Sequence, residues 1–453
     1  MERVANALHS AVPPKCSILL GLSGGMDSVV LLHLLHSLAP RFEWRISALH
    51  VHHGISPNAD AWANFCTELC LRYNIPLHIE HVDIAPLRGA HGIEAAARKL
   101  RHAAFSKQNC DFVALAQHAD DQAETLLLQL LRGAGVKGAA AMPVLSRVEG
   151  PVLSLSKRPL VKPASQHMHA TLRPLLGMPR SELLAYATQH ALQWVEDESN
   201  ADDSYPRNFL RHRVLPLLEQ KFPAYRTTLT RSAQHFAEAA DLLDELAQQD
   251  AHGWSADTPL DISLLRSLSH ARGKNLLRYF LHRCGAPMPQ GAQLDDMLHQ
   301  LCSARQDAAV CVGFGDWEVH RYQDKVYVLP TLGEFDRNLV LPWNGEAELE
   351  WPALNTRLLF SRRIGQGASL EKLQRAPVTL RLRSGGETLR PHPAAATRSL
   401  KNLLQEHHVP PWQRERLPLL YCGDELACVV GVAIAADYQA QENEASVVVS
   451  VLP

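Results

Sequence analysis

Two short polar stretches contain the residue types that nucleotide chemistry uses. The first, SGGMDS at residues 23–28, joins two apolar runs and supplies two adjacent glycines, two hydroxyls and one carboxylate. Adjacent glycines let backbone N–H groups turn inward, and a following helix N-terminus adds partial positive charge, which together favour a phosphate-binding nest. The plainer alternative is a tight turn in which Asp27 or Ser28 only caps the helix.

The second stretch, DDQAET, begins at Asp120 and places three acids close together. On a helix, Asp121 and Glu124 share one face because they are three residues apart. Such carboxylates could hold Mg²⁺ against phosphates, or receive an ammonium group and later its proton. Helix capping explains Asp120 equally well, since acids are favoured at a helix N-terminus.

Other nucleotide and metal motifs are absent from the sequence. The lysine of GxxxxGK followed by Ser or Thr is missing, and so is GxGxxG. Without that lysine to hold the outer phosphates, we expect chemistry at the α-phosphate, with pyrophosphate leaving. The three histidines of HVHHG, at 50, 52 and 53, lack a further ligand at zinc spacing, so they more plausibly line a ligand pocket than bind a metal. Nine scattered cysteines, also without metal-ligand spacing, indicate free thiols in a reducing compartment.

The elements that would position these stretches alternate between strand and helix. Strands are predicted at 17–23, 45–54, 77–84 and 111–117, and helices at 27–38, 59–73, 93–108 and 119–135. Strict alternation predicts an α/β fold with a doubly wound parallel sheet. SGGMDS, HVHHG and QHADD then all fall at the carboxyl ends of strands, where such sheets bind ligands.

The rest of the chain changes in character. We expect an ATP-binding catalytic domain at 1–215, a mainly helical domain at 216–332 that ends in an antiparallel hairpin, and a small α+β domain at 333–453. Residues 143–165, rich in Pro, Ser and Val without any period, are expected to form a surface loop.

Composition and charge bound the function. The 453 residues carry 45 basic and 47 acidic side chains, so no global field attracts nucleic acid. Two local clusters are nevertheless basic. They are residues 207–226 and residues 357–401, and the second contains ten Lys or Arg but only two acidic residues. They favour a polyanion that touches several domains. The sequence shows neither a signal peptide nor a membrane span, which predicts a cytoplasmic protein without a membrane partner.

The combined motifs resemble the tRNA(Ile)-lysidine synthetase family of PP-loop ATP pyrophosphatases over nearly the whole chain. SGGxDS alone would specify only that superfamily. The narrower resemblance is carried by LSGGMDS, HVHHGI, GIEAAARKLRHAAF, AQHADDQAETLLLQLLRGAG, RPLLGMPRSEL, WVEDESNADDSYPRNFLRHRVLPLL and SLKNLLQEHHVPPWQRERLPLLY.

The resemblance implies an enzyme that uses ATP, Mg²⁺ and free L-lysine to modify the wobble cytidine of an isoleucine tRNA with a CAU anticodon. The cytidine O2 would attack the α-phosphate to give an adenylated base and pyrophosphate. The lysine ε-amine would then displace AMP at C2.

Roles for individual residues are expected from the same match. The catalytic set would be Asp27, Arg98, Asp121 and Glu124, with Arg101 as an alternative to Arg98 for offsetting charge at the α-phosphate. ATP would bind Ser23, Gly24, Gly25, Met26, Asp27, Ser28, His50 and His52. Asp27 and Asp121 would hold Mg²⁺, and Asp121 and Glu124 would bind lysine. The tRNA would contact Arg207, Asn208, Arg211, Arg381, Arg383 and Lys401. For Trp412, core packing is at least as well supported as base stacking.

The sequence departs from the family pattern at two places. Gln117 replaces the first of two histidines that often precede the acids, so a general base there is doubtful, and the 143–165 loop is long. Three alternatives stay open. A tRNA sulfurtransferase would need paired cysteines, whereas the chain has no CxxC. An amidating ligase would need an ammonia source, and a tRNA-binding protein could keep a vestigial nucleotide site. The oligomeric state, including a homodimer, is also open.

Overall fold

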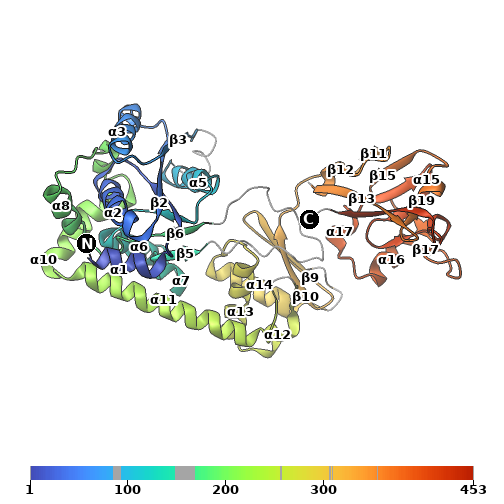
Figure 1. Ribbon diagram of the computed structural model, residues 1–453. Coiled ribbons are helices and arrows are strands. Elements are labelled where there is room, and N and C mark those ends of the chain that lie inside the picture. The colour runs from blue at the N-terminus through green and yellow to red at the C-terminus, as the bar shows by residue number, and fades with distance from the viewer. Residues whose placement is uncertain are drawn as a thin grey trace. The chain divides into compact units, whose positions relative to one another are not determined.

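The computed structural model describes residues 2–84, 93–147, 169–255, 258–305, 308, 310–354 and 356–451. These residues fall into two compact units, which are divided within the long helix α11 Tyr225–Asp250, between Glu245 and Leu246. Helices and strands of both units are shown in Figure 1. Among the described residues, no helix has both the length and the apolar character that a membrane span requires.

The first unit is built on a six-stranded sheet in the order β3-β2-β1-β4-β6-β5. Neighbouring strands from β3 to β6 pair in parallel, and β5 pairs antiparallel with β6 at the edge. The strands are β1 Ser17–Gly21, β2 Arg45–His52, β3 Leu77–His81, β4 Phe112–Ala114, β5 Leu145–Arg147 and β6 Ala170–Leu172. The α/β fold with a parallel N-terminal sheet is therefore confirmed.

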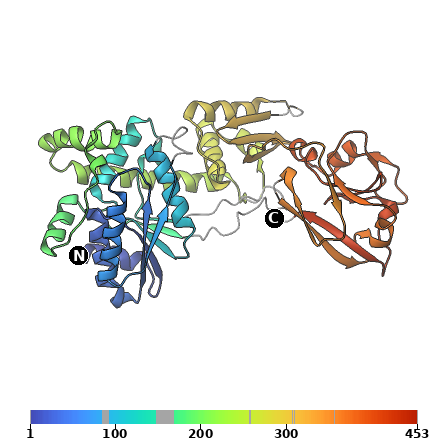
Figure 2. The ribbon, with the colours of Figure 1, turned by 90° about the horizontal axis from the view of Figure 1, so that it is seen from above.

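Helices cover both faces of this sheet (Figures 1 and 2). Successive residues of a strand point to opposite faces, so Ile18 and Leu20 join one core with α1, α2, α3 and α8. Leu19 lies in a separate core with Phe105 of α5. Burial on both faces explains why the strands read as continuous apolar runs. The helices are α1 Glu2–Ala11, α2 Met26–Phe42, α3 Ala59–Arg72, α5 Ile93–Ser106, α6 Ala119–Leu131, α7 Val136–Ala139 and α8 Arg180–Gln189.

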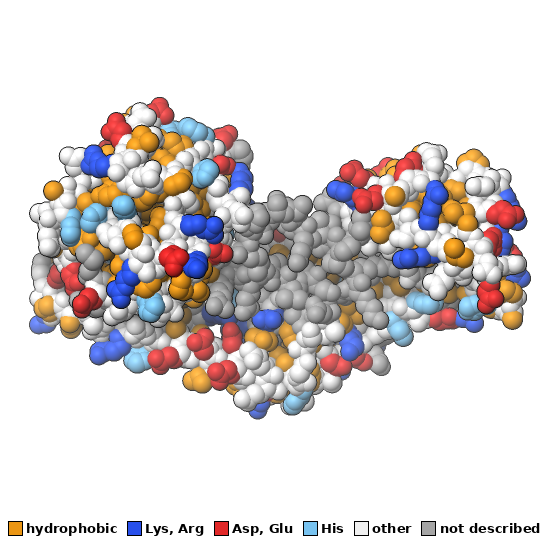
Figure 3. All heavy atoms as spheres, in the orientation of Figure 1, with side chains coloured by type: hydrophobic (Ala, Val, Ile, Leu, Met, Phe, Trp, Pro, Cys, Tyr) orange, Lys and Arg blue, Asp and Glu red, His pale blue; other side chains and the backbone are white. Residues whose placement is uncertain are grey.

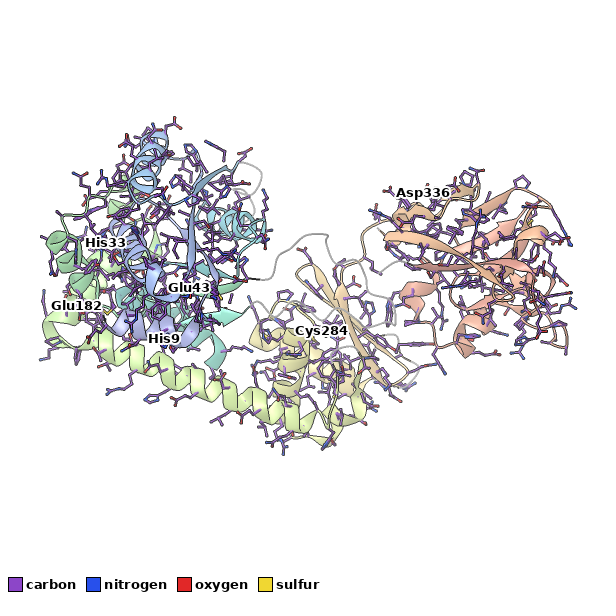
Figure 4. All side chains as sticks on the ribbon, in the orientation of Figure 1. His9, His33, Glu43, Glu182, Cys284 and Asp336 are labelled. Atoms are coloured by element: carbon purple, nitrogen blue, oxygen red, sulfur yellow. The ribbon has the colours of Figure 1, made fainter. Side chains whose placement is uncertain are left out.

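Helix α2 begins within the SGGMDS stretch, at Met26, and packs against α8. His33 of α2, labelled in Figure 4, lies 2.8 Å from the Tyr186 hydroxyl of α8 through its Nδ1 atom. The remaining elements of this unit are α9 Pro206–Phe209, a π-helical turn over Leu210–Val214, α10 Leu215–Lys221 and most of α11 Tyr225–Asp250. Helix α6 packs on α10 and α11 through Ala123, Leu126, Leu215, Tyr225 and Ala233.

The predicted loop at 143–165 needs correction at its start. Residues Leu145–Arg147 form β5, which pairs with β6, a strand that the sequence pattern did not reveal. Three-residue strands carry too little periodicity to be recognised. Residues 148–165 of the predicted loop lie outside the described residues.

The second unit begins with a small helical layer against a four-stranded antiparallel sheet, ordered β7-β10-β9-β8. The predicted hairpin is confirmed as β8 Val310–Phe314, β9 Trp317–Tyr322 and β10 Lys325–Pro330. The other elements are β7 Leu260–Asp261, α12 Ile262–Ser267, α13 His270–Arg283 and α14 Gly291–Ser303. Their shared core includes Phe280, Leu294, Met297 and Val319.

The C-terminal part has two larger antiparallel sheets and a two-stranded one. Their orders are β11-β15-β18-β19-β20, β12-β13-β21-β14 and β16-β17. The strands are β11 Val340–Trp343, β12 Glu348–Trp351, β13 Thr356–Ile364, β14 Ala368–Ser369, β15 Val378–Arg381, β16 Thr388–Leu389, β17 Arg398–Ser399, β18 Leu419–Cys422, β19 Glu425–Val429, β20 Ala433–Ile434 and β21 Ala445–Val451. Short helices are α15 Leu370–Leu373, α16 Leu400–Glu406 and α17 Pro411–Arg414.

Candidate active site

The SGGMDS loop has a conformation that requires glycine. Gly24 has φ +87°, and a Cβ atom there would lie 2.9 Å from Cγ2 of Val195. The Gly24 carbonyl accepts a hydrogen bond from the Val195 N–H at 3.0 Å, which ties the loop to the WVEDESN segment. The hydroxyls of Ser23 and Ser28 lie 3.2 Å apart, and Ser28 donates to the Gly25 carbonyl. The loop is therefore fixed by residues from two of the sequence motifs.

Buried polar atoms without a hydrogen-bond partner gather after four neighbouring strands of the sheet. Among the described residues, these are Asp27 Oδ1 after β1, both ring nitrogens of His53 after β2, Gln117 Oε1 and His118 Nδ1 after β4, and Arg173 Nε after β6. The four strands are adjacent in the order β2-β1-β4-β6. Buried polar groups are normally paired, so such atoms at one sheet edge indicate where a polar ligand binds.

His118 precedes α6 and lies among three carboxylates. Its Nε2 is 3.6 Å from Asp27 Oδ2 and 3.5 Å from Asp121 Oδ2, and its Nδ1 is 3.6 Å from Asp120 Oδ2. Burial acts to lower the pKa of His118, but the contact with Asp27 and the charges of the neighbouring carboxylates outweigh burial and raise it. The His118 N–H donates to Asp121 Oδ2 at 3.0 Å. His118 therefore links the first strand's loop to the acidic helix start.

Asp121 and Glu124 are paired with two arginines of the YPRNFLRHR segment. Glu124 is fully buried and accepts from Nε of Arg207 and Nε of Arg211, each at 2.7 Å. Asp121 Oδ1 accepts from Nη2 of Arg207 at 3.2 Å and of Arg211 at 3.4 Å. Arg207 lies in α9, and Arg211 lies four residues later in the π-helical turn, so both reach the same side. π-Helical turns of this kind occur frequently at functional sites.

This pairing joins residues with different predicted roles. Arg207 and Arg211, expected to contact tRNA, are the described partners of Asp121 and Glu124, expected to bind lysine. Asn208, also expected to contact tRNA, is buried and donates from its side-chain amide to the Asp202 carbonyl at 2.9 Å.

Asp120 contacts His118 as well, but its hydrogen bonds go to a second set of partners. Its Oδ2 accepts from the Arg180 N–H at the start of α8 at 2.8 Å, and its Oδ1 accepts from Arg226 Nε at 2.5 Å. Arg226 also makes a two-point contact with Glu219 and lies over the Tyr225 ring. Burial acts to raise the pKa of Asp120, but the Arg180 N–H and the Arg226 guanidinium outweigh burial and lower it. Asp120 therefore anchors α6 to α8 and α11.

The histidines of HVHHG have distinct surroundings. His50 is buried, with Nδ1 2.9 Å from the Leu22 carbonyl, and burial lowers its pKa. His52 Nε2 lies 3.0 Å from Asp60 Oδ1. Burial, followed by the charge of Arg101, lowers the pKa of His53 to about 4. His53 is therefore neutral near pH 7, and its two unpaired nitrogens can serve a ligand as donor and acceptor.

Two arginines, Arg98 of α5 and Arg173 after β6, contribute positive charge near this edge of the sheet. Arg98 is exposed on α5, and burial followed by the charge of Arg98 lowers the pKa of the Arg173 guanidinium to about 10. Arg173 Nη1 donates to the Pro143 carbonyl at 3.0 Å, whereas its Nε has no described partner. Sequence reasoning missed Arg173 as a site residue. Predicting residues 170–172 as a strand would have revealed it, because the arginine of RPLL follows that strand directly.

The C-terminal residues expected to contact tRNA are mostly engaged within the protein. Arg381 donates to the Gly423 carbonyl at 2.9 Å and lies over the Tyr421 ring, and Arg383 lies 3.6 Å from Glu387. Lys401 is exposed on α16. Basic and acidic side chains are interspersed on the face of this part seen in Figure 3. Trp412 contacts His320, Tyr322 and Tyr327, which supports the packing interpretation.

Three family models match different parts of this chain. Residues 1–218 match a PP-loop domain, residues 260–327 the TilS substrate binding domain, and residues 378–451 the TilS substrate C-terminal domain. The tRNA(Ile)-lysidine synthase of Nitrosomonas europaea is 43% identical over 98% of this chain and 93% of its own length. The chain belongs to the tRNA(Ile)-lysidine synthase family.

Two further members of that family support the assignment over nearly the full length. The tRNA(Ile)-lysidine synthase of Azoarcus sp. is 40% identical over 98% of this chain and 93% of its own. That of Coxiella burnetii is 38% identical over 93% of this chain and 90% of its own. The resemblance expected from the sequence motifs is confirmed.

Proposed function

We propose that this enzyme ligates free L-lysine to C2 of the wobble cytidine of a CAU-anticodon isoleucine tRNA. ATP is consumed, an adenylated cytidine is the intermediate, and AMP and pyrophosphate are released. Membership of the lysidine synthase family supports this activity. The observation that carries it in the structure is the row of unpartnered buried polar atoms at the carboxyl edge of the sheet, next to a glycine-dependent loop.

For ATP, we propose that residues 23–28 hold phosphate oxygens, with His50 and His52 beside the adenosine. Gly24 and Gly25 leave room for the close approach of phosphate to backbone, and Ser23 and Ser28 add hydroxyl donors. We assign Arg98 to offset charge at the α-phosphate. Its effect on Arg173 supports a positive potential at this edge.

The carboxylates differ in how well they fit Mg²⁺, which accepts oxygen ligands. Asp27 fits, because its buried Oδ1 has no described partner. Asp121 fits less well, because Oδ2 already accepts the His118 N–H and Oδ1 faces two guanidiniums. We propose both as ligands, with Asp121 required to release its arginines. Bound Mg²⁺ would neutralise phosphate charge there.

For lysine, we propose that Asp121 and Glu124 bind the incoming amino acid and accept its proton. Their carboxylates are preorganised, because Arg207 and Arg211 hold both oxygens of Glu124 and Oδ1 of Asp121, while the backbone N–H of His118 holds Oδ2 of Asp121. The ammonium group of a bound lysine would either displace an arginine from these carboxylates or form a further ion pair with them. The charge of Arg207 and Arg211 is in turn available for an anionic group of the substrates.

For tRNA, we propose phosphate contacts from Arg207, Arg211, Arg381, Arg383 and Lys401, with Asn208 fixing the loop that presents the first two. Such contacts predict binding that weakens steeply with salt. We further propose domains at 1–215, 216–332 and 333–453, a cytoplasmic location, and either a monomer or a homodimer, which sedimentation would distinguish.

The test is AMP release from ATP labelled at the α-phosphate, in the presence of Mg²⁺. A CAU-anticodon isoleucine tRNA is compared with the initiator methionine tRNA, each with and without lysine. AMP formed only with the isoleucine tRNA and lysine supports the proposal. Turnover without lysine, or none with either tRNA, contradicts it and would favour an amidating ligase or a tRNA-binding protein.

A further inference from the structure

A second group of chemically reactive side chains lies in the second unit, on the β8–β9 hairpin. Cys311 of β8 and His320 of β9 are paired residues in the antiparallel register, so their side chains emerge on the same face. Glu318 lies two residues before His320 and shares that face. The Sγ of Cys311, a carboxylate oxygen of Glu318 and a ring nitrogen of His320 lie within 4.8 Å of one another.

The three side chains meet at a single atom. His320 Nε2 lies 2.8 Å from Glu318 Oε2 and 3.8 Å from Cys311 Sγ. A nucleophile relay needs the thiol and the carboxylate on opposite ring nitrogens, since the carboxylate orients the histidine that activates the thiol. Here both contact Nε2. The arrangement therefore does not fit a nucleophile relay and instead resembles ligands converging on a common centre.

The spacing and the donor types fit a tetrahedral metal ion. With Zn–S and Zn–N or Zn–O bonds of about 2.3 and 2.1 Å, ligand atoms around zinc lie about 3.4 to 3.6 Å apart. The two distances from Nε2 bracket that range, and all three ligand atoms lie within 4.8 Å of one another, so ligation needs side-chain shifts on the order of 1 Å. A thiolate with an imidazole and a carboxylate suits Zn²⁺, whereas Mg²⁺ and Ca²⁺ prefer oxygen ligands.

Neighbouring aromatic rings fix the histidine. The Trp412 ring lies 4.3 Å from the His320 ring, centroid to centroid, and also contacts Tyr327. Tyr327 of β10 is the register partner of His320 on the other side of the hairpin. The His320 side chain is only 10% exposed, while that of Glu318 is 25% exposed and Cys311 is exposed. An ion at this position would thus have a rigid inner side and an open outer side.

We propose that Cys311, Glu318 and His320 bind one Zn²⁺ ion, with water as the fourth ligand. The ion would crosslink β8 to β9 and stabilise the aromatic contact with Trp412. This site involves none of the residues assigned to ATP, lysine or tRNA, so it is independent of the proposed function.

The test uses the full-length protein, stripped of metal and titrated with Co²⁺ and then Zn²⁺. We expect one tight site per chain, a thiolate-to-cobalt charge-transfer band in the near ultraviolet that Zn²⁺ abolishes, and a change in Trp412 fluorescence. Cys311→Ser should remove the band and weaken binding by more than about tenfold, the smallest loss typical even of altered supporting contacts. Because Cys311 is exposed, this variant should fold.

Two matched controls separate this site from other thiols. Cys302→Ser changes a half-buried thiol of α14, and should leave the band and the stoichiometry unchanged. Cys284, labelled in Figure 4, is buried in the core of the helical layer, so it should not bind the added Co²⁺ or Zn²⁺. Binding that survives Cys311→Ser unchanged, or a cobalt spectrum without a thiolate band, would overturn the proposal. Glu318→Gln with intact affinity would exclude the carboxylate as a ligand.

Discussion

Two groups of polar side chains lie near the start of α6, and they differ in whether the protein satisfies them. Glu124 and Asp121 have arginine partners for their carboxylates. Asp27 and Gln117 each keep a buried oxygen without a described partner. The first group resembles a structural ion-pair network, while the second has the signature of a ligand site. Substitutions in the first group should therefore mainly change stability, and substitutions in the second group should mainly change activity.

The largest effect is expected at Glu124, which belongs to the ion-pair network and is also assigned to lysine binding. Glu124→Gln leaves Arg207 and Arg211 facing a neutral amide, and breaking a buried ion pair costs about 3 kcal/mol or more of unfolding free energy. Lysine-dependent AMP release should also fall by about 100-fold, as expected for loss of a proton acceptor. Denaturant unfolding and the labelled-ATP assay measure the two effects. The exposed Glu68→Gln on α3 is the control and should change neither.

Asp27→Asn should affect activity without affecting the fold. Its Oδ1 makes no described hydrogen bond, and its Oδ2 has the 3.6 Å contact with His118 Nε2, so replacing the charge removes one long contact from the folded state. The free energy of unfolding should therefore change by no more than about 1 kcal/mol. AMP release should drop by about 100-fold because phosphate charge or Mg²⁺ loses its counter-ligand. Raising Mg²⁺ should partly restore a ligand variant. A stability loss as large as that of Glu124→Gln would mean that Asp27 belongs to the structural network.

The sequence predicted the members of both groups better than their partners. Motifs at strand ends identified Asp27, Asp121 and Glu124, because alternating strands and helices bring such ends to one edge. It could not predict that Glu124 pairs with Arg207, some 83 positions away, since ion-pair partners depend on how α9 packs on α6. Arg173 escaped prediction because its strand has only three residues.

The proposed metal ligands of the second unit also depend on contacts between elements. Cys311 and His320 are nine residues apart, which is not a zinc-motif spacing, and only antiparallel register brings them together. The fold class could be predicted from the sequence alone, because strands that are buried on both faces consist of continuous apolar residues. Patterns along the chain thus predict elements and their ends, whereas contacts between elements require the three-dimensional packing.

A smaller effect is expected for the network that anchors α6 to α11. Arg226→Lys keeps a positive charge but loses the planar contact with Asp120 and Glu219, so unfolding free energy should fall by about 1 to 2 kcal/mol. Activity should fall only a few-fold, because neither acid is assigned to a substrate. Arg213→Lys is a matched control: its pair with Asp203 is exposed, and the change should be under about 0.5 kcal/mol. Equal effects would mean that the Asp120 anchor contributes nothing special.

The smallest effect concerns pH and tests the unpartnered group through His53. Its pKa in the folded protein is about 4, lowered mainly by burial, whereas an exposed histidine titrates near 6.5. Between those values the unfolded chain binds more protons, so this contribution to stability is present above about pH 6.5 and is lost as the pH falls toward 4. Between pH 7.5 and pH 5.5, the unfolding temperature of the wild-type protein should therefore fall by a few degrees more than that of His53→Gln. Parallel pH profiles for the two proteins would show that the pKa of His53 is not lowered in the folded protein. His53 would then not belong to the buried ligand-binding edge.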